Sequence, residues 1–292
     1  MAFSAGRFYP GDHKGCQCQA VPVLLYPEAE NATGRTGPLT IAPTDRFPGG
    51  LSVADSQAWM QNKWGTPDLW GPSGPPPGTP ELGLRFDFRL YTREAANEAA
   101  AELDDLFREY PWTTRGIHVV TGPQNLKTWP ANQGGLAERG TGTIRYGHVE
   151  SPTWWTNTKN LAQQNSLGLT PWHPTGTAAW RHSVVSHEFG HHLYWRARSS
   201  GGEMNVRRAV QKVIEKYVGT KPPGAALDNA VFEWNQRAQS FIERNLSRYA
   251  NSDFDSGGEE LIAEAFASTR GTAPTEFAQD LIKTVLYYAE KR

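Results

Sequence analysis

The chain has few cysteines, almost no net charge and no long apolar run. Only Cys16 and Cys18 occur among its 292 residues, which excludes a framework of disulfide bonds. The formal net charge is -1 at pH 7, and no long run of Lys and Arg indicates nucleic acid as a partner. No stretch approaches the ~20 apolar residues of a transmembrane helix, and residues 1–7 lack the apolar core of a signal peptide. We therefore expect a soluble protein that is made in a cytoplasm and does not bind a membrane.

Residues 1–80 differ in composition from the rest of the chain. They are rich in Gly and Pro, and the segment from Gly71 to Pro80 can form neither a helix nor a central strand. One short helix is predicted within this region, over 52–64, with Ser52 as its N-cap. We interpret residues 1–80 as an irregular extension or linker and residues 81–292 as the folded domain.

Residues 81–292 show the periodicity of strands first and of helices afterwards. Alternating or continuous short apolar runs predict strands over residues 84–90, 117–120 and 143–149. Longer amphipathic segments predict helices over residues 92–110, 176–198, 203–217, 228–246, 258–269 and 274–291. Thr92 is the expected N-cap of the first of these helices, and Pro111 ends it. The order predicts an α+β domain with a small mixed sheet and a helical C-terminal half.

The most informative segment is residues 187–191, His-Glu-Phe-Gly-His, on the helix predicted over 176–198. Two histidines four residues apart on a helix are separated by about 40° around the axis and roughly 6 Å along it, so both can bind one metal ion. Glu188 lies about 100° around the axis from His187 and can reach a water molecule on that ion. This is the arrangement of a zinc hydrolase, with two ligands and a base. The same pattern also arises by chance, so the motif alone does not establish a metal site. The surrounding sequence has to decide.

A catalytic zinc ion needs a third protein ligand and one position that stays open for water. In one branch of zinc proteases a Gly and a His follow the motif at fixed offsets; Tyr194 and Ala197 stand there instead, which excludes that branch. A carboxylate from the helix over 258–269 is the alternative, since Glu260 and Glu264 share one face of it. Glu260 would bind the metal, and Glu264 would orient a ligand histidine. The competing interpretation is an amphipathic surface helix with two solvated glutamates.

Taken together, residues 187–191, the Ser-Arg-Tyr segment at 247–249 and the Glu-rich segment at 260–266 resemble the gluzincin-type zinc metallopeptidases. Within that group the resemblance is to the catalytic domain of the anthrax-lethal-factor type and its phage-encoded relatives. It covers roughly residues 85–290, and its two ligand helices are its specific part. The resemblance implies a zincin-like fold and a zinc-dependent endopeptidase.

Carried over residue by residue, the resemblance implies that His187, His191 and Glu260 bind Zn²⁺ and that Glu188 is the general base. Tyr249 would face the reacting carbonyl; because its spacer to Glu260 is longer than in the family, a plain packing role is the alternative. Family members pair extended substrate with an edge strand. The resemblance implies that the strand predicted over 143–149, which lies just before the metal helix in the order of predicted elements, is this edge strand. The implied partner is therefore a polypeptide substrate.

A second resemblance lies near the N-terminus. Residues 12–22, which contain His13, Cys16 and Cys18, are similar to the end of the phage Mu-type minor head protein domain, which closes on a His…Cys-x-Cys…Pro pattern. The same three residues are candidate ligands of a small structural zinc site; two unpaired thiols in a tail are the alternative. The two resemblances together imply a phage head-associated peptidase, located in the host cytoplasm during assembly or in the virion, with phage head proteins as partners.

Three functional hypotheses follow from these residues. The leading one is a zinc-dependent endopeptidase that hydrolyses peptide bonds through a metal-activated water. The second is a non-catalytic structural, head-associated phage protein that retains a zincin fold. The third is a lethal-factor-like effector protease, which shares the chemistry of the first in another setting.

Overall fold

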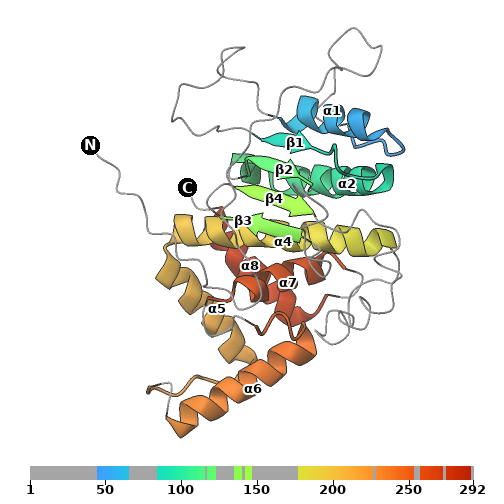
Figure 1. The fold of residues 1–292 in the computed structure, drawn as a ribbon. Coiled ribbons are helices and arrows are strands. Elements are labelled where there is room, and N and C mark those ends of the chain that lie inside the picture. The colour runs from blue at the N-terminus through green and yellow to red at the C-terminus, as the bar shows by residue number, and fades with distance from the viewer. Residues whose placement is uncertain are drawn as a thin grey trace, which may run out of the picture.

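The computed structural model describes residues 45–65, 84–115, 117–122, 135–139, 142–146, 177–225, 228–252, 257–271 and 274–290. These residues form one four-stranded sheet, a short 3₁₀ helix and seven α-helices (Figure 1). The helices are α1 (Val53–Trp64), α2 (Arg93–Glu109), α4 (Thr177–Gly201), α5 (Glu203–Val218), α6 (Asn229–Asn245), α7 (Glu259–Thr269) and α8 (Glu276–Ala289), and the 3₁₀ helix is η2 (Pro111–Arg115). The α+β class predicted from the sequence is confirmed.

The sheet has the strand order β1-β2-β4-β3. Its strands are β1 (Arg85–Asp87), β2 (Val119–Thr121), β3 (Gly135–Glu138) and β4 (Thr143–Tyr146). The first two and β4 run parallel, and β3 pairs antiparallel with β4. The expectation that the strand over 143–149 is the edge strand is therefore wrong. The antiparallel pairing with β3 covers that side of β4, so β3 is the edge strand on this side of the sheet and β1 is the edge strand on the other, among the described residues.

The first two helices begin at the N-caps that the sequence predicts. The Ser52 hydroxyl accepts a hydrogen bond from the Asp55 N–H at 3.1 Å, and the Thr92 hydroxyl accepts one from the Ala95 N–H at 3.2 Å. Each cap satisfies one of the backbone donors left open at a helix start. Helix α1 packs against α2, and its Trp59 joins the same core as the sheet. A helix from within residues 1–80 thus belongs to the core that the folded domain builds.

Helix α4 is the central element of the structure. It contacts α2, α5, α7, α8 and both strands β3 and β4, and it runs along the sheet in Figure 1. Its Phe189 is fully buried and its ring lies 5.7 Å from Phe266 of α7 and 6.1 Å from Phe107 of α2. Gly190 allows α7 to come close, because a Cβ at this position would lie 2.8 Å from the Ala263 Cα. The close crossing brings the first turns of α7 beside the His-Glu-Phe-Gly-His segment.

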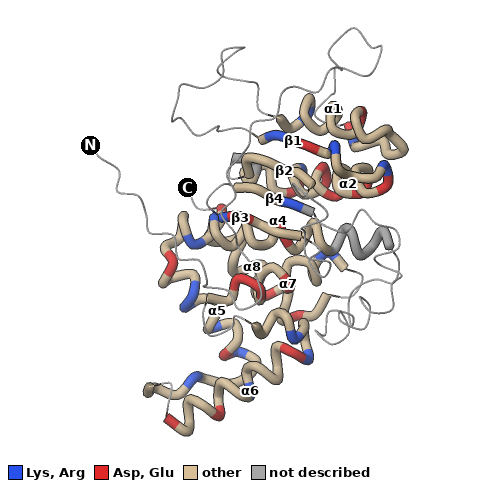
Figure 2. Tube along the Cα trace, in the orientation of Figure 1, with Lys and Arg blue, Asp and Glu red and all other residues tan. Residues whose placement is uncertain are grey.

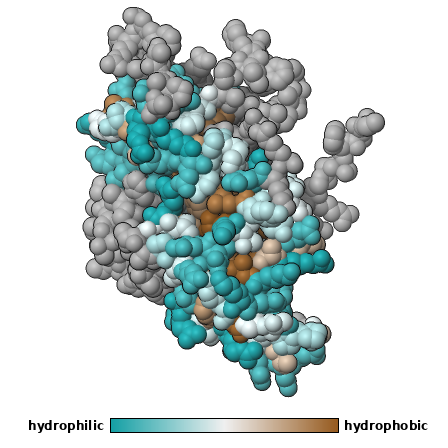
Figure 3. Space-filling model, turned by 180° about the vertical axis from the view of Figure 1, so that it is seen from behind, coloured by the Kyte–Doolittle hydropathy of each residue, from teal (hydrophilic) through white to brown (hydrophobic). Residues whose placement is uncertain are grey.

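The remaining helices surround α4 on the side away from most of the sheet. Helix α8 packs against α4, α5 and α7, while α6 contacts α5 and extends away from the body (Figure 1). Acidic and basic residues are interspersed along the described elements (Figure 2). Seen from behind, the described surface is mostly hydrophilic with small apolar patches (Figure 3). Among the helices that the structure describes, none has both the length and the apolar character needed to cross a membrane.

Candidate metal centre

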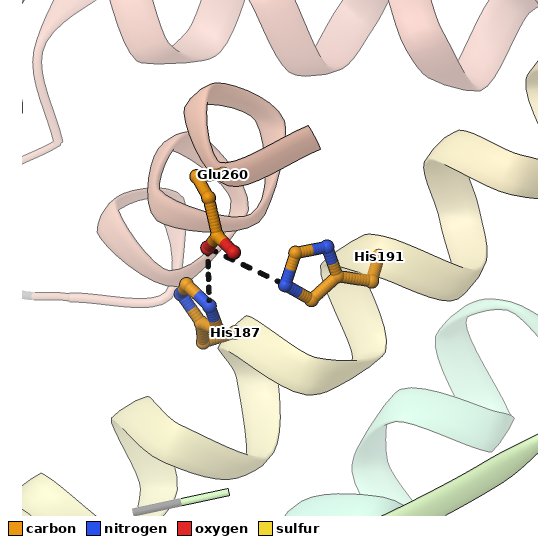
Figure 4. Close-up of side chains that lie close together, drawn as sticks. All are labelled: His187, His191 and Glu260. Carbon is orange, nitrogen blue, oxygen red and sulfur yellow. Dashed lines mark ion pairs between the residues drawn. The ribbon is translucent and has the colours of Figure 1, made fainter. Parts of the chain in front are cut away.

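Two histidines of α4 and one glutamate of α7 meet at the crossing of these helices (Figure 4). Nε2 of His187 lies 3.2 Å from Oε2 of Glu260, and Nε2 of His191 lies 3.5 Å from the same oxygen. One ligand atom from each of the three residues lies within 4.8 Å of the other two. The residues predicted as ligands are therefore brought together, close enough to hold one metal ion.

His191 and Glu260 are buried and His187 is partly buried, and the charges of the three side chains stabilise one another. Burial by itself lowers the pKa of a histidine and raises that of a carboxyl, because it disfavours the charged form. Here the mutual contacts outweigh burial: the pKa of His187 lies well above 6.5, and the pKa of His191 is also raised. Despite burial, the same two histidines hold the pKa of Glu260 far below 4.5. The carboxylate thus sits, ionised and buried, at a point where positive charge is favoured.

Glu264 lies one helical turn after Glu260 and contacts the other side of His187. Its Oε1 is 2.8 Å from Nδ1 of His187, and its Oε2 accepts a hydrogen bond from the Ser247 hydroxyl at 2.7 Å. Ser247 in turn accepts one from the Ala250 N–H at 2.9 Å. Because Glu264 occupies Nδ1, the ring presents Nε2 toward Glu260. The geometry is that expected for Glu264 from the sequence, whereas the part played by Ser247 was missed.

Tyr249 reaches the same cluster from the segment that follows α6. Its ring stacks on the His187 imidazole, with the ring centroids 5.7 Å apart and an interplanar angle of 27°. The side chain is half-buried. The structure therefore places Tyr249 beside the candidate ligand His187, whose imidazole Glu264 also contacts.

Glu188 is buried between the candidate ligands and the edge strand β3. Its carboxylate accepts a hydrogen bond from the Ala137 N–H. Gly135 makes room for it, because a Cβ at that position would lie 2.5 Å from Oε1 of Glu188. Burial raises the pKa of Glu188 to about 6, and the positive charges of His187 and His191 oppose that rise. A carboxyl with such a pKa can accept and release a proton near neutral pH.

The sequence also predicts a second, structural metal site near the N-terminus. His13, Cys16 and Cys18 lie outside the described residues. Among the described residues, His187, His191 and Glu260 are the group of metal-ligating side chains that comes together. The metal chemistry discussed below therefore concerns these three residues.

Comparison with known proteins found no match: no protein-family model, no curated protein and no solved structure matches the chain. The function of the α4–α7 cluster is therefore inferred from its own geometry and chemistry.

Proposed function

We propose that this protein is a zinc-dependent endopeptidase with a zincin-like catalytic domain. The observation that carries the proposal is the largely buried group formed by His187, His191 and Glu260, with the buried Glu188 carboxyl interacting with all three. The α+β architecture supports it, since a small sheet precedes the two helices that bear the candidate ligands. The phage-related setting suggested by the sequence stays a prediction.

The donor set fits zinc better than the other common protein metals. Two imidazole nitrogens and one carboxylate oxygen form a known type of catalytic zinc site, which keeps a fourth position for water. Mg²⁺ and Ca²⁺ prefer sites built from oxygen alone. The Glu264 contact to His187 is the carboxylate–histidine interaction that commonly orients a zinc ligand. His187, His191 and Glu260 would hold the ion.

When bound by His187, His191 and Glu260, zinc would lower the pKa of a coordinated water to roughly 7 and would polarise a substrate carbonyl. Glu188 is the general base in this proposal: it takes a proton from the water as the oxygen attacks the peptide carbonyl carbon. The C–N bond then breaks, and Glu188 passes the proton to the leaving nitrogen, giving a carboxyl and an amine. Burial, which raises the pKa of Glu188, suits both roles, because it makes the carboxylate easier to protonate.

Two further features support a peptide as substrate. The edge strand β3 borders Glu188, and an extended peptide can add to such an edge through main-chain hydrogen bonds. Tyr249 is proposed to donate a hydrogen bond from its hydroxyl to the carbonyl oxygen as negative charge develops there. Its stacking on His187 supports a place close to the reacting bond.

Metal content and peptide cleavage test the proposal together. The wild-type protein is expected to contain about one chelator-removable zinc per chain and to cleave members of a peptide library. Glu260→Ala should lose the zinc, whereas Glu188→Ala should keep it and abolish cleavage. Glu276→Ala, at an exposed carboxylate on α8, is the matched control and should change neither property. Zinc binding without cleavage by the wild type would instead favour a structural protein.

A further inference from the structure

The two candidate histidine ligands are supported in different ways. Nδ1 of His187 is hydrogen-bonded by Glu264, but Nδ1 of His191 is buried and has no hydrogen-bond partner in the described part of the chain. A ligand histidine commonly donates this second nitrogen to an acceptor, which fixes its ring orientation. The plane of the His191 ring has to be set by another contact.

Trp195 supplies that contact. It follows His191 by one helical turn on α4, and its ring stacks on the imidazole with the centroids 5.7 Å apart and an interplanar angle of 22°. Parallel stacking restricts rotation of the imidazole about its bond to Cβ, since any turn of the ring would lose the contact. His192 meets the same indole edge-on, with centroids 5.0 Å apart, so the indole is confined from a second side.

The indole is itself fixed to α7. Its Nε1–H donates a hydrogen bond to Oε2 of Glu259 at 2.8 Å. The other carboxylate oxygen of Glu259 accepts from the Arg198 guanidinium, and both side chains of this ion pair are buried. Glu259 directly precedes the candidate ligand Glu260. Trp195 therefore couples the orientation of His191 on α4 to the position of the ligand-bearing turn of α7.

We propose that Trp195 is a positioning residue for His191, with Glu259 and Arg198 holding its indole in register. The inference rests on the proposed function in one respect, namely that the α4–α7 cluster binds zinc. A packing anchor alone would contribute to the stability of the fold but would not affect the geometry of a bound metal. The two interpretations differ in what they predict for metal affinity and for the spectrum of a bound ion.

Trp195→Leu and Trp195→Phe separate the two contacts of the indole. Leucine removes both the stacking and the N–H, and we expect roughly 10–100-fold weaker Zn²⁺ binding, as for other residues that orient a ligand. Phenylalanine keeps a ring against His191 but loses the bond to Glu259, so its affinity should lie between those of Trp195→Leu and the wild type. Competition with a chromophoric chelator measures the affinity for Zn²⁺ in each variant.

The absorption spectrum of the Co²⁺-loaded protein reports the geometry directly. Trp195→Leu should change the position or intensity of the visible bands, and Trp195→Phe should change them less. Trp234 offers a matched control, because it is fully buried on α6 and its Nε1–H donates to the Gly219 carbonyl at 2.6 Å. Trp234→Phe should lower the unfolding temperature while leaving Zn²⁺ affinity and the Co²⁺ spectrum at their wild-type values.

The outcomes distinguish this inference from the function on which it rests. If the wild type binds zinc but both Trp195 variants match it in affinity and spectrum, Trp195 is not a positioning residue, although the metal centre stands. If the wild type binds neither Zn²⁺ nor Co²⁺, the proposed metal centre itself is overturned. A graded loss across the two variants, absent from Trp234→Phe, is the result that supports the inference.

Discussion

Helix α7 begins with two adjacent buried glutamates that meet α4 in different ways. Glu259 contacts the Arg198 guanidinium and the Trp195 indole, and these three residues are called the arginine contact. Glu260 contacts the imidazoles of His187 and His191, and these three are called the histidine contact. The two contacts lie side by side at the same helix crossing and bury a carboxylate each.

The two contacts differ in whether the basic side chains can lose a proton and bind a metal ion. Arginine stays protonated in proteins and has no free electron pair to offer a metal, so the arginine contact is complete as an ion pair. A histidine loses its proton readily, and its neutral ring nitrogen is a common metal ligand. The buried carboxylate of Glu259 therefore stabilises the packing of α7 against α4, whereas that of Glu260 belongs to a candidate metal centre.

The largest effect is expected from breaking the arginine contact. Arg198→Ala would leave the Glu259 carboxylate buried without its cation, which typically costs about 3–5 kcal/mol of folding free energy. Urea unfolding of the metal-free protein measures this loss. Arg46→Ala, at an exposed pair with Asp105, is the control and should cost less than about 1 kcal/mol. Equal losses of folding free energy for the two variants would contradict the distinction between the buried ion pair and the exposed one.

A somewhat smaller effect on the free energy of unfolding is expected when zinc binds at the histidine contact. Zinc at about 100 times its dissociation constant should stabilise the folded protein by ~2.7 kcal/mol, because it binds the folded state. Glu260→Ala should abolish this gain. Arg198→Ala starts from lower stability but should still gain from zinc. Denaturant unfolding with and without the metal gives both values, and an unchanged gain in Glu260→Ala would show that Glu260 is not a ligand.

The smallest effect is expected at Ser247, which is linked to the histidine contact through Glu264. Ser247→Ala removes the hydroxyl that donates to Glu264, and the loss of one such hydrogen bond corresponds to ~1 kcal/mol, or roughly fivefold in Zn²⁺ affinity. Isothermal titration with zinc measures the change. Ser240→Ala, at an exposed serine on α6, should bind as tightly as the wild type. Unaltered affinity in Ser247→Ala would mean that Glu264 holds His187 without help from Ser247.

The sequence predicts the histidine contact better than the arginine contact, for a physical reason. Spacing of four residues on one helix places His187 with His191, and Glu260 with Glu264, before any tertiary packing is known. Arg198 and Glu259 are 61 positions apart and carry no such local pattern. The support of His191 by Trp195 was missed in the same way, because it depends on how a ring orients once α7 has docked.

The sheet shows a similar limit. The N-caps and the extents of α2 and of the C-terminal helices follow from local signals, and the structure confirms them within a few residues. Strand β3 was not predicted, since Gly135–Glu138 is too short to show alternation and is defined by pairing with β4. That pairing also decides which strand borders Glu188, so the edge available to a peptide could be identified only in the folded chain.

Zinc stoichiometry in a matched pair of variants tests the central claim most directly. Glu259→Gln and Glu260→Gln each remove one buried carboxylate at the same helix crossing, but only Glu260 is a candidate ligand. Equilibrium dialysis against saturating zinc should give about one zinc per chain for the wild type and for Glu259→Gln, which keeps all three ligands and is weakened only through Trp195, and almost none for Glu260→Gln. A wild-type protein without zinc, or equal zinc in the two variants, would contradict the assignment of the histidine contact as a metal centre.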